Sequence, residues 1–508
     1  MKRLKKLGAL LGILVVCCIA TYALTHYEEK QEQIRSSEAV ILEIDGSSVT
    51  SLAWEYEGEE DALSFYKEDD VWYYAEDAAF PVSEEKVMDI LSNFEAFSSS
   101  FCIENVEDYS QYGLDEPECT LTIGIGEDTT TIKLGAYSKM DEQRYVDIGD
   151  GNVYLVPEDP VDYVTSSVSN MILDDTTPGF ETVVDIRFEG AENYIIQRME
   201  DTDYSYSDED VYYVQKNGKY LPLDTTNVTS YLNTITTLDL LDYVTYNATE
   251  EELEGYGLAE PELTITVNYT YTDEDGETDE SGEKPLLSDT CVIHIGRNAE
   301  ELAAAQEAEA NGEEPEDVSA YVRVGESQIV YSLDSLDYDT LAGASYEDLR
   351  HKEVFWADFA DVTRIDITLE DTEHTLTSQI DPEDEDSRLW YYGQQEETEE
   401  ATEETTEEAT EETAEEAQEP ETLDVSDLES AIKALYANSF TDEAPSGKEE
   451  IRLTLHLDNE TFPEVEIVLY RYSGSECLAV VDGQSVSLVS RSSVMELVEA
   501  VQTIVLEY

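Results

Sequence analysis

Histidines are the first residues to examine for chemistry, because an imidazole near neutral pH can act as a base or hold a metal. The chain of 508 residues contains five of them. His26 follows an apolar N-terminal run, whereas His294 and His456 lie within alternating, strand-like sequence. None of these three pairs with another histidine at a metal-ligand spacing, and no H-E-x-x-H occurs. The histidines therefore predict neither a metal site nor a catalytic base.

Motifs for other chemistry are missing or incomplete. There is no G-x-x-x-x-G-K-[ST] phosphate loop and no G-x-S-x-G nucleophile motif. Gly124 and Gly126 lack the third glycine of a dinucleotide loop, so they predict a hairpin. Asp201, Asp203 and Asp208 resemble a calcium loop in part, but the glycine that such a loop needs is missing. We predict no catalytic, cofactor-binding or metal site residue, no cofactor and no enzyme activity.

Charge limits the partners of the chain. Asp and Glu number 120 against 27 Lys and Arg, which gives a formal net charge of −93. Because phosphate binding needs clustered Lys and Arg, we expect no nucleic-acid partner. A catalytic pair could lie among so many carboxylates, but the sequence does not single one out.

A repeated heptapeptide organises the elements. Tyr112–Glu118 and Tyr256–Glu262 differ at one position, and each leads into an alternating run, Cys119–Ile123 and Leu263–Val267. A match of this kind predicts an internal repeat of domain size.

Two interpretations of the heptapeptide remain. It is either a turn, with Gly113 and Gly257 in the left-handed region and the following leucine buried, or a ligand loop contacted through Tyr112 and Glu116. In the first interpretation Pro117, which has no N–H, suits the first position of a strand.

The first predicted unit spans residues 40–178. Period-two alternation predicts strands at 49–55, 62–67, 71–75, 120–125, 131–134, 144–148 and 153–156. Ser83 is a predicted N-cap, and the apolar residues after it recur at helical spacing. Val161, Val164, Val168 and Met171 predict a closing helix after Pro160.

The same order returns at 179–357, with acidic insertions at 273–289 and 297–319, and more weakly at 358–508. The third unit has a predicted helix at 427–437, and its run 450–455 aligns with 118–123. We therefore predict an α+β fold: an N-terminal transmembrane helix, then three repeated units of antiparallel sheet with packed helices, the third degenerate.

Two polar segments and the cysteines complete the organisation. Residues 28–39 form a predicted stalk, and 396–421 hold fourteen glutamates without Lys or Arg, which predicts a disordered loop. That loop is either a solvated spacer or a weak cation or partner lure. Cys119 and Cys477 are expected as buried free thiols, with a Cys102–Cys119 disulfide as the alternative.

The N-terminus indicates a membrane address. Residues 1–27 carry four Lys and Arg before the apolar run Leu7–Leu24, which is long enough to nearly cross a bilayer of about 30 Å. We interpret this segment as an uncleaved signal anchor, with a cleaved signal peptide as the alternative. The basic flank places the N-terminus in the cytoplasm and the rest outside.

Several of these motifs resemble those of one known family. The turn Tyr112–Glu118, the Ile-x-Leu-Gly run 132–135 and the Val-Tyr-Leu-Val strand 153–156, with their counterparts at Tyr256–Glu262, 293–296 and 329–333, resemble the bacterial domain-of-unknown-function family 4340. This resemblance implies an envelope protein, often encoded near ABC transporters of the gliding-motility type. It supplies no catalytic residues.

Two functions follow as hypotheses. The first is a membrane-anchored extracytoplasmic binding or scaffold protein of unknown ligand, with an ABC transporter permease as the partner that the resemblance suggests. The alternative is a carboxylate-dependent hydrolase of the cell envelope. A deep cleft with two facing carboxylates of raised pKa would favour the alternative.

The anchor interpretation predicts that the protein stays in the membrane after washing with high salt and carbonate. Protease added to intact cells should digest everything beyond the stalk, because the acidic units face outward. Fractionation and immunoblotting check both points. Release by salt alone, or protection of the C-terminal units, would contradict the predicted topology.

Overall fold

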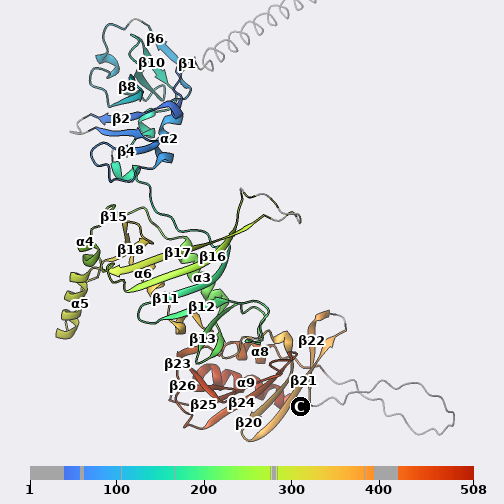
Figure 1. Ribbon diagram of the computed structural model, residues 1–508. Helices are drawn as coiled ribbons and strands as arrows, with labels where there is room; N and C mark the ends of the chain where they lie inside the picture. Colours follow the sequence, from blue (N-terminus) through green and yellow to red (C-terminus); the bar gives the residue numbers. More distant parts are fainter. Residues whose placement is uncertain are drawn as a thin grey trace, which may run out of the picture. The chain divides into compact units, whose positions relative to one another are not determined.

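The computed structural model describes residues 39–507 except 58–61, 105, 166, 275, 277, 279–281, 283, 383 and 394–421. The described residues form antiparallel sheets with a few helices, which confirms the α+β class (Figure 1). No helix within them is long and apolar enough to span a membrane. The predicted anchor, the stalk up to residue 38 and the glutamate-rich segment 396–421 lie outside the described residues.

The first sheet has the strand order β4-β3-β2-β7-β8-β9-β10-β6, with every neighbour antiparallel. Its strands are β2 (Ser51–Tyr56), β3 (Leu63–Glu68), β4 (Val71–Tyr74), β6 (Phe101–Ile103), β7 (Cys119–Ile125), β8 (Asp128–Ser138), β9 (Gln143–Asp147) and β10 (Val153–Val156). Strands β1 (Ala39–Leu42) and β5 (Phe97–Ser99) form a separate antiparallel pair. Helix α2 (Glu84–Ser92) begins at the predicted cap Ser83, whose hydroxyl accepts from the Lys86 N–H.

The second sheet has the order β14-β13-β12-β11-β16-β17-β18-β19-β15. Its strands are β11 (Thr182–Glu189), β12 (Tyr194–Arg198), β13 (Tyr212–Lys216), β14 (Lys219–Pro222), β15 (Tyr243–Thr245), β16 (Leu263–Thr272), β17 (Leu286–Arg297), β18 (Ala320–Val324) and β19 (Val330–Leu333). The associated helices are α3 (Thr225–Thr236), α4 (Glu250–Gly255), α5 (Ala299–Asn311), α6 (Ser335–Ala342) and α7 (Tyr346–Leu349). Helix α5 lies in the second acidic insertion, and none of its residues is buried.

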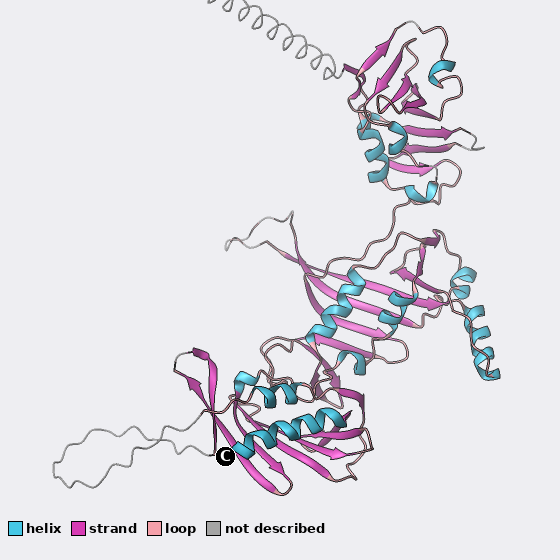
Figure 2. Cartoon of the chain, turned by 180° about the vertical axis from the view of Figure 1, so that it is seen from behind, coloured by secondary structure: helices cyan, strands magenta, loops and turns pink. Residues whose placement is uncertain are grey.

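The third sheet has the order β22-β21-β20-β24-β25-β26-β27-β23 and is antiparallel throughout. Its strands are β20 (Val362–Leu369), β21 (Thr372–Asp381), β22 (Asp384–Tyr392), β23 (Ala437–Phe440), β24 (Glu449–Leu457), β25 (Glu464–Arg471), β26 (Glu476–Val481) and β27 (Gln484–Ser490). Helices α8 (Ser426–Lys433) and α9 (Arg491–Glu507) lie against one face, and their apolar residues join its core (Figure 2).

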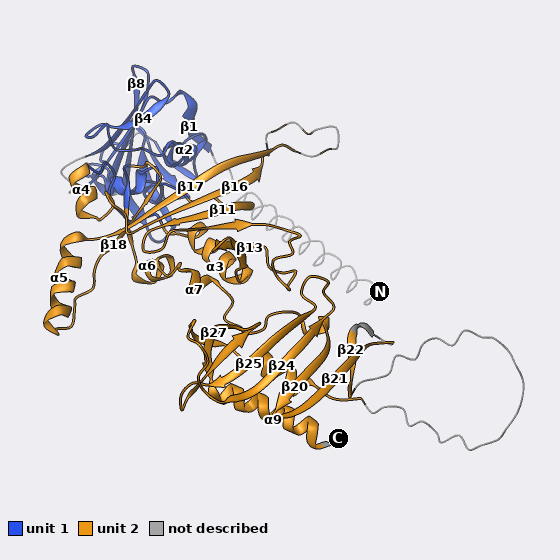
Figure 3. Ribbon diagram, turned by 60° about the horizontal axis from the view of Figure 1, so that its bottom comes forward, with its two compact units in different colours: residues 1–176, 240–249, 328–330 blue, residues 177–239, 250–327, 331–508 orange. Residues whose placement is uncertain are grey.

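All three sheets share one order of connections. In each sheet the chain first forms a meander and then a helix. A second meander follows, and its first strand pairs with the first strand of the earlier meander: β7 with β2, β16 with β11 and β24 with β20. By contact density the chain divides into two compact units (Figure 3). Unit 1 comprises 1–176, 240–249 and 328–330, and unit 2 comprises 177–239, 250–327 and 331–508. The three predicted ranges stay a prediction.

Some local predictions were wrong. The predicted closing helix at 161–171 is two 3₁₀ turns, Pro160–Tyr163 and Val168–Met171. In the third unit the helix ends at Lys433, and Ala437 begins strand β23. Pro117 lies two residues before the strand that it was expected to open. Among the described cysteines no disulfide forms, so the Cys102–Cys119 alternative is wrong.

The heptapeptide is a turn, as the first interpretation predicts. Gly113 and Gly257 have φ values of 67° and 70°, and Leu114 and Leu258 are buried. The turn also packs closely on a neighbouring strand, because a Cβ on Gly257 would lie 2.4 Å from the Arg297 carbonyl oxygen.

An ion pair lies at the start of the central strand in all three sheets, beside the turn in the first two. In each, a glutamate directly before or at the start of the central strand binds an arginine: Glu118 with Arg144 at 2.6 Å, Glu262 with Arg297 at 2.7 Å, and Glu450 with Arg471 at 2.5 Å. Arg144 is buried and also binds the Asp159 carboxylate and the Gly135 carbonyl. The third sheet keeps this contact although its sequence lacks the Tyr-Gly-Leu turn.

Gly257→Val should destabilise the protein by on the order of 1–3 kcal/mol, because a β-branched residue is strained at positive φ and meets the neighbouring backbone. Gly126→Val is the matched control, since Gly126 has a φ of 62° but open space around its Cβ position. Urea unfolding should show the larger loss for Gly257→Val and almost none for Glu260→Gln. Equal losses at Gly126 and Gly257 would contradict the close-packing explanation.

Candidate functional site

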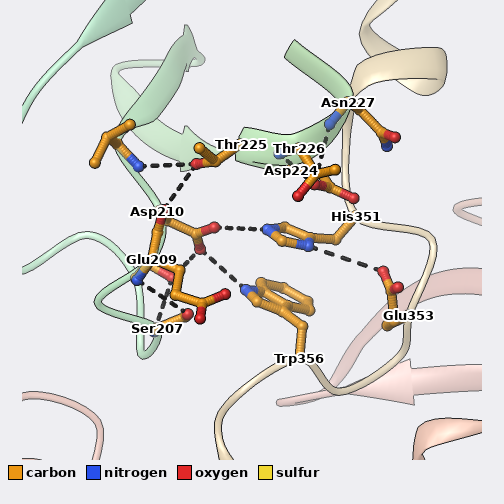
Figure 4. A network of polar contacts seen from close by, with 12 residues as sticks. Ser207, Glu209, Asp210, Asp224, Thr225, Thr226, Asn227, His351, Glu353 and Trp356 are labelled. Carbon is orange, nitrogen blue, oxygen red and sulfur yellow. Dashed lines mark hydrogen bonds and ion pairs between the residues drawn. The ribbon is translucent and has the colours of Figure 1, made fainter. Parts of the chain in front are cut away.

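The candidate site is a cleft of about 300 Å³ within unit 2, between the second sheet and the segment that leads into the third. Its charged and aromatic lining includes Asp210, Asp224, His351, Glu353 and Trp356. Figure 4 shows these side chains converging from three segments of the chain.

Two of the segments belong to the second sheet. Asp210 ends the loop between β12 and β13, and Asp224 is the N-cap of α3, where its Oδ1 accepts from the Thr226 and Asn227 N–H groups. The Asp224 N–H donates to the Leu349 carbonyl, which ties the start of α3 to the end of α7. Aspartate is among the best N-cap residues, so local structure alone accounts for its place here.

The third segment is the linker from α7 to β20, and it carries His351, Glu353 and Trp356. The Val354 N–H donates to the Leu435 carbonyl, and Val354 and Phe355 lie in the core of the third sheet. The linker is thus held at the end of α7 and again at Val354, which fixes the positions of the His351 and Glu353 side chains.

Aromatic packing completes the frame. The His351 ring stacks on Trp356 with centroids 4.4 Å apart and planes 8° from parallel. Tyr206, from the same loop as Asp210, lies 4.6 Å from the Trp356 ring and inside the core of the third sheet. The loop therefore brings Asp210 to the linker by burying an aromatic side chain.

Asp210 is the centre of the hydrogen bonds. Its side chain is 2% exposed, and it accepts from His351 Nε2 at 2.8 Å and from Trp356 Nε1 at 3.0 Å. The Ser205 hydroxyl also donates to it. On the other side of the imidazole ring, Nδ1 lies 3.9 Å from Glu353 Oε2, an ion-pair distance.

These contacts set the charge states. Burial lowers the pKa of His351, but its hydrogen bond to Asp210, its contact with Glu353 and the charges of Asp210 and Asp224 outweigh burial and raise this pKa to about 9. His351 in turn lowers the pKa of Glu353 to about 2, against the opposing effect of burial. At neutral pH the cluster is therefore an ionised network rather than an acid and base poised near 7.

The residues weighed from sequence lie elsewhere. His294 Nδ1 contacts the Thr264 hydroxyl within the second sheet, and His456 pairs with Asp366 in the third. Tyr112 packs on the Tyr145 ring, at 5.0 Å between centroids. His26 lies outside the described residues.

Sequence reasoning did not single out this cluster, and the prediction of no site residue stays a prediction. Asp201, Asp203 and Asp208 belong to the loop that carries Asp210, but none of them is in the group whose ligand atoms could hold a metal. The local signal is His351-Lys352-Glu353, which puts an imidazole and a carboxylate two residues apart. Its partners stand 127 and 141 positions earlier, at Asp224 and Asp210, so no spacing in the sequence reveals them.

Comparison with protein families gives a match over most of the chain. The model of the family described as a domain of unknown function, DUF4340, matches residues 72–197 and 214–454. Neither a curated protein nor a solved structure matches the chain.

The ion pairs predict a pH dependence with a defined sign. The pKa of His351 rises from 6.5 to about 9 on folding, so its contribution is complete below pH 6.5 and is lost as pH rises through 9. Relative to His351→Gln, the wild type should lose on the order of 3 kcal/mol of unfolding free energy across this interval. Urea unfolding in chelating buffer from pH 6 to about pH 10 measures the difference.

His294→Gln is the control for that measurement. Burial and Arg323 lower the pKa of His294, so its effect has the opposite sign and falls below pH 6.5. It should not reproduce the loss between pH 7 and 9. A flat difference for His351→Gln over this range would contradict the ion-pair description.

Proposed function

This chain belongs to the DUF4340 family, and we propose that it is a membrane-anchored extracytoplasmic binding or scaffold protein. In this proposal residues 1–27 form a single-pass signal anchor with a cytoplasmic N-terminus. The units at 40–178, 179–357 and 358–508 are repeats of one fold outside the membrane. Other membrane proteins are the partners, and an ABC-type permease is the candidate that the family resemblance suggests.

The repeat proposal is supported by local contacts as well as by strand order. Tyr112 packs on Tyr145 with centroids 5.0 Å apart, and Tyr256 packs on Tyr321 at 4.7 Å. Both pairs join the heptapeptide turn to the strand after the Ile-x-Leu-Gly run, which is β9 in the first sheet and β18 in the second. Unrelated folds would not be expected to share such a contact at corresponding positions.

The faces of the sheets that point away from the core, the open faces, support the binding proposal. Along each central strand, buried apolar residues alternate with half-buried polar ones, which are Thr120 and Thr122 in β7, Thr264 and Thr266 in β16, and Arg452 and Thr454 in β24. Alternation of this kind indicates a sheet with one face on the core and one toward solvent. Repetition multiplies this polar surface threefold, as expected of a protein that holds partners.

Charge states in the cleft favour binding over the hydrolase alternative. A general acid needs a carboxyl whose pKa is raised toward neutrality. The pKa of Glu353 is lowered to about 2. The pKa values of Asp337 and Asp361 are raised, mainly by burial, but neither residue lines this cleft.

The net charge of −93 constrains the partner. Partners must present basic or apolar patches, because a second acidic surface would be repelled. A basic contact of this type weakens as salt rises from about 0.05 to 0.5 M, since the Debye length shrinks over that range.

We expect the full-length protein, solubilised from membranes at low salt, to co-purify with other membrane proteins. Thr266→Arg on the open face of the second sheet should reduce recovery of the partner. Gln306→Arg on the exposed helix α5 adds the same charge and should not. Quantitative mass spectrometry of the tagged variants measures the recovery.

The same preparation tests the alternative. We expect no turnover of peptide, ester or glycan substrates by the chain from about residue 28 onward. Recovery of no protein above a tag-only control would contradict the scaffold proposal. Turnover abolished by one Asp or Glu substitution would favour the hydrolase instead.

A further inference from the structure

Three potential ligand atoms converge in the cleft. One atom each from Asp224, His351 and Glu353 lie within 4.8 Å of one another. A tetrahedral cation with N and O ligands at 2.0–2.2 Å holds neighbouring ligand atoms about 3.4 Å apart. The 3.9 Å between His351 Nδ1 and Glu353 Oε2 closes to that value by a shift of about half an ångström.

The imidazole is already oriented for such a role. Asp210 takes the hydrogen bond of Nε2, and stacking on Trp356 fixes the plane of the ring. Nδ1 consequently points toward Glu353 (Figure 4). A carboxylate on the far nitrogen is the usual arrangement of a histidine that binds metal, because it fixes the tautomer and raises basicity.

The two carboxylates offer oxygens that lack donors. Glu353 Oε2 is buried and has no hydrogen-bond partner among the described residues. Both hydrogen bonds that Asp224 accepts in the described part of the chain end on Oδ1, so Oδ2 is available as a ligand atom. Lys433, which also lines the cleft, is paired with Glu429 at 2.6 Å. A buried carboxylate oxygen without a close donor is costly, and a bound metal would compensate Glu353 Oε2 more directly than His351 Nδ1 does at 3.9 Å.

We propose that Asp224, His351 and Glu353 bind one divalent transition-metal cation of the zinc class, which displaces the Nδ1 proton of His351 to solvent, with Asp210 as the positioning residue for His351. The imidazole selects zinc over magnesium and calcium, which prefer oxygen ligands alone. Water from the cleft supplies the fourth ligand. The metal links the start of α3 to the linker before the third sheet, so its role is to fasten two parts of unit 2.

The chain contains a matched comparison. His456 Nε2 lies 2.8 Å from Asp366, and its Nδ1 lies 4.0 Å from Glu464, almost the same geometry as at His351. Glu464 is 64% exposed, however, and Asp366 also binds Arg364. In the described part of the chain this histidine is not in a group of three close ligands.

The test uses the full-length chain after treatment with a chelator. Zn²⁺ is titrated by calorimetry in excess Mg²⁺, which occupies the oxygen-only sites of so acidic a protein. Co²⁺ is then added as a spectroscopic probe of tetrahedral coordination. We expect one tight Zn²⁺ site per chain and a visible Co²⁺ band that Zn²⁺ removes.

Variants assign the site. Glu353→Gln and Asp224→Asn should each weaken Zn²⁺ binding by about 10-fold or more. Glu464→Gln should leave it unchanged. Asp224→Asn keeps the helix cap, since asparagine caps as well as aspartate. If circular dichroism shows that metal-free Glu353→Gln is unfolded, the Zn²⁺ affinity of Asp224→Asn alone tests the site.

Two results would overturn the proposal. One is the absence of a tight Zn²⁺ site in the wild type. The other is a loss for Glu464→Gln equal to that for Asp224→Asn, which would indicate diffuse binding to acidic surface.

Discussion

Each sheet is built outward from one central strand, and a glutamate–arginine ion pair lies at the start of that strand. The pair matters most in the first sheet, where the Arg144 side chain is 4% exposed. Glu118 is 50% exposed, so the Asp159 carboxylate, which is 16% exposed, would lose most if Arg144 were removed, because its charge would be left without compensation. Arg297 and Arg471 are 27% and 48% exposed, so solvent screens their pairs and each contributes less. The glutamate–arginine contact is therefore partly exposed in all three sheets, and its arginine is most deeply buried in the first.

The position of the arginine is not constant, although its contact is. In the first sheet Ala136 follows the glycine of the Ile-x-Leu-Gly run, and Arg144 precedes the tyrosine of the next strand. In the second sheet the two residue types are exchanged: Arg297 follows the glycine and Ala320 precedes the tyrosine, and these two residues pair across the strands. Adjacent positions on neighbouring strands reach the same glutamate. If evolution retained the ion pair but not the position of its arginine, the sequences of the units would diverge while this contact stayed the same.

Sequence patterns predicted the elements that depend on local physics. Alternation placed β2 to within two residues, and Ser83 and Gly113 have the conformations their types favour. The prediction of a closing helix was wrong because the Asp159 and Ser167 side chains each accept a hydrogen bond from the backbone N–H two residues later. These local bonds begin two separate short turns in place of one helix. The His351 cluster could not be predicted from sequence for another reason, because its residues come together only when two sheets have formed. Only the histidine and glutamate two residues apart give a local hint.

The scarce cations explain how so acidic a chain folds and what remains for binding. With 27 Lys and Arg against 120 acids, most carboxylates have no cationic partner. Several arginines bind carboxylates of their own sheet, as Arg144 does beside Glu118 and Arg452 does between Glu449 and Glu466. Guanidinium suits this use because its planar fork binds two carboxylates at once. Cations committed to these contacts cannot neutralise the outer surface, so any close partner has to bring positive charge of its own. A metal ion at His351 would obey the same rule on a smaller scale, as a cation taken up where carboxylates outnumber the available side-chain cations.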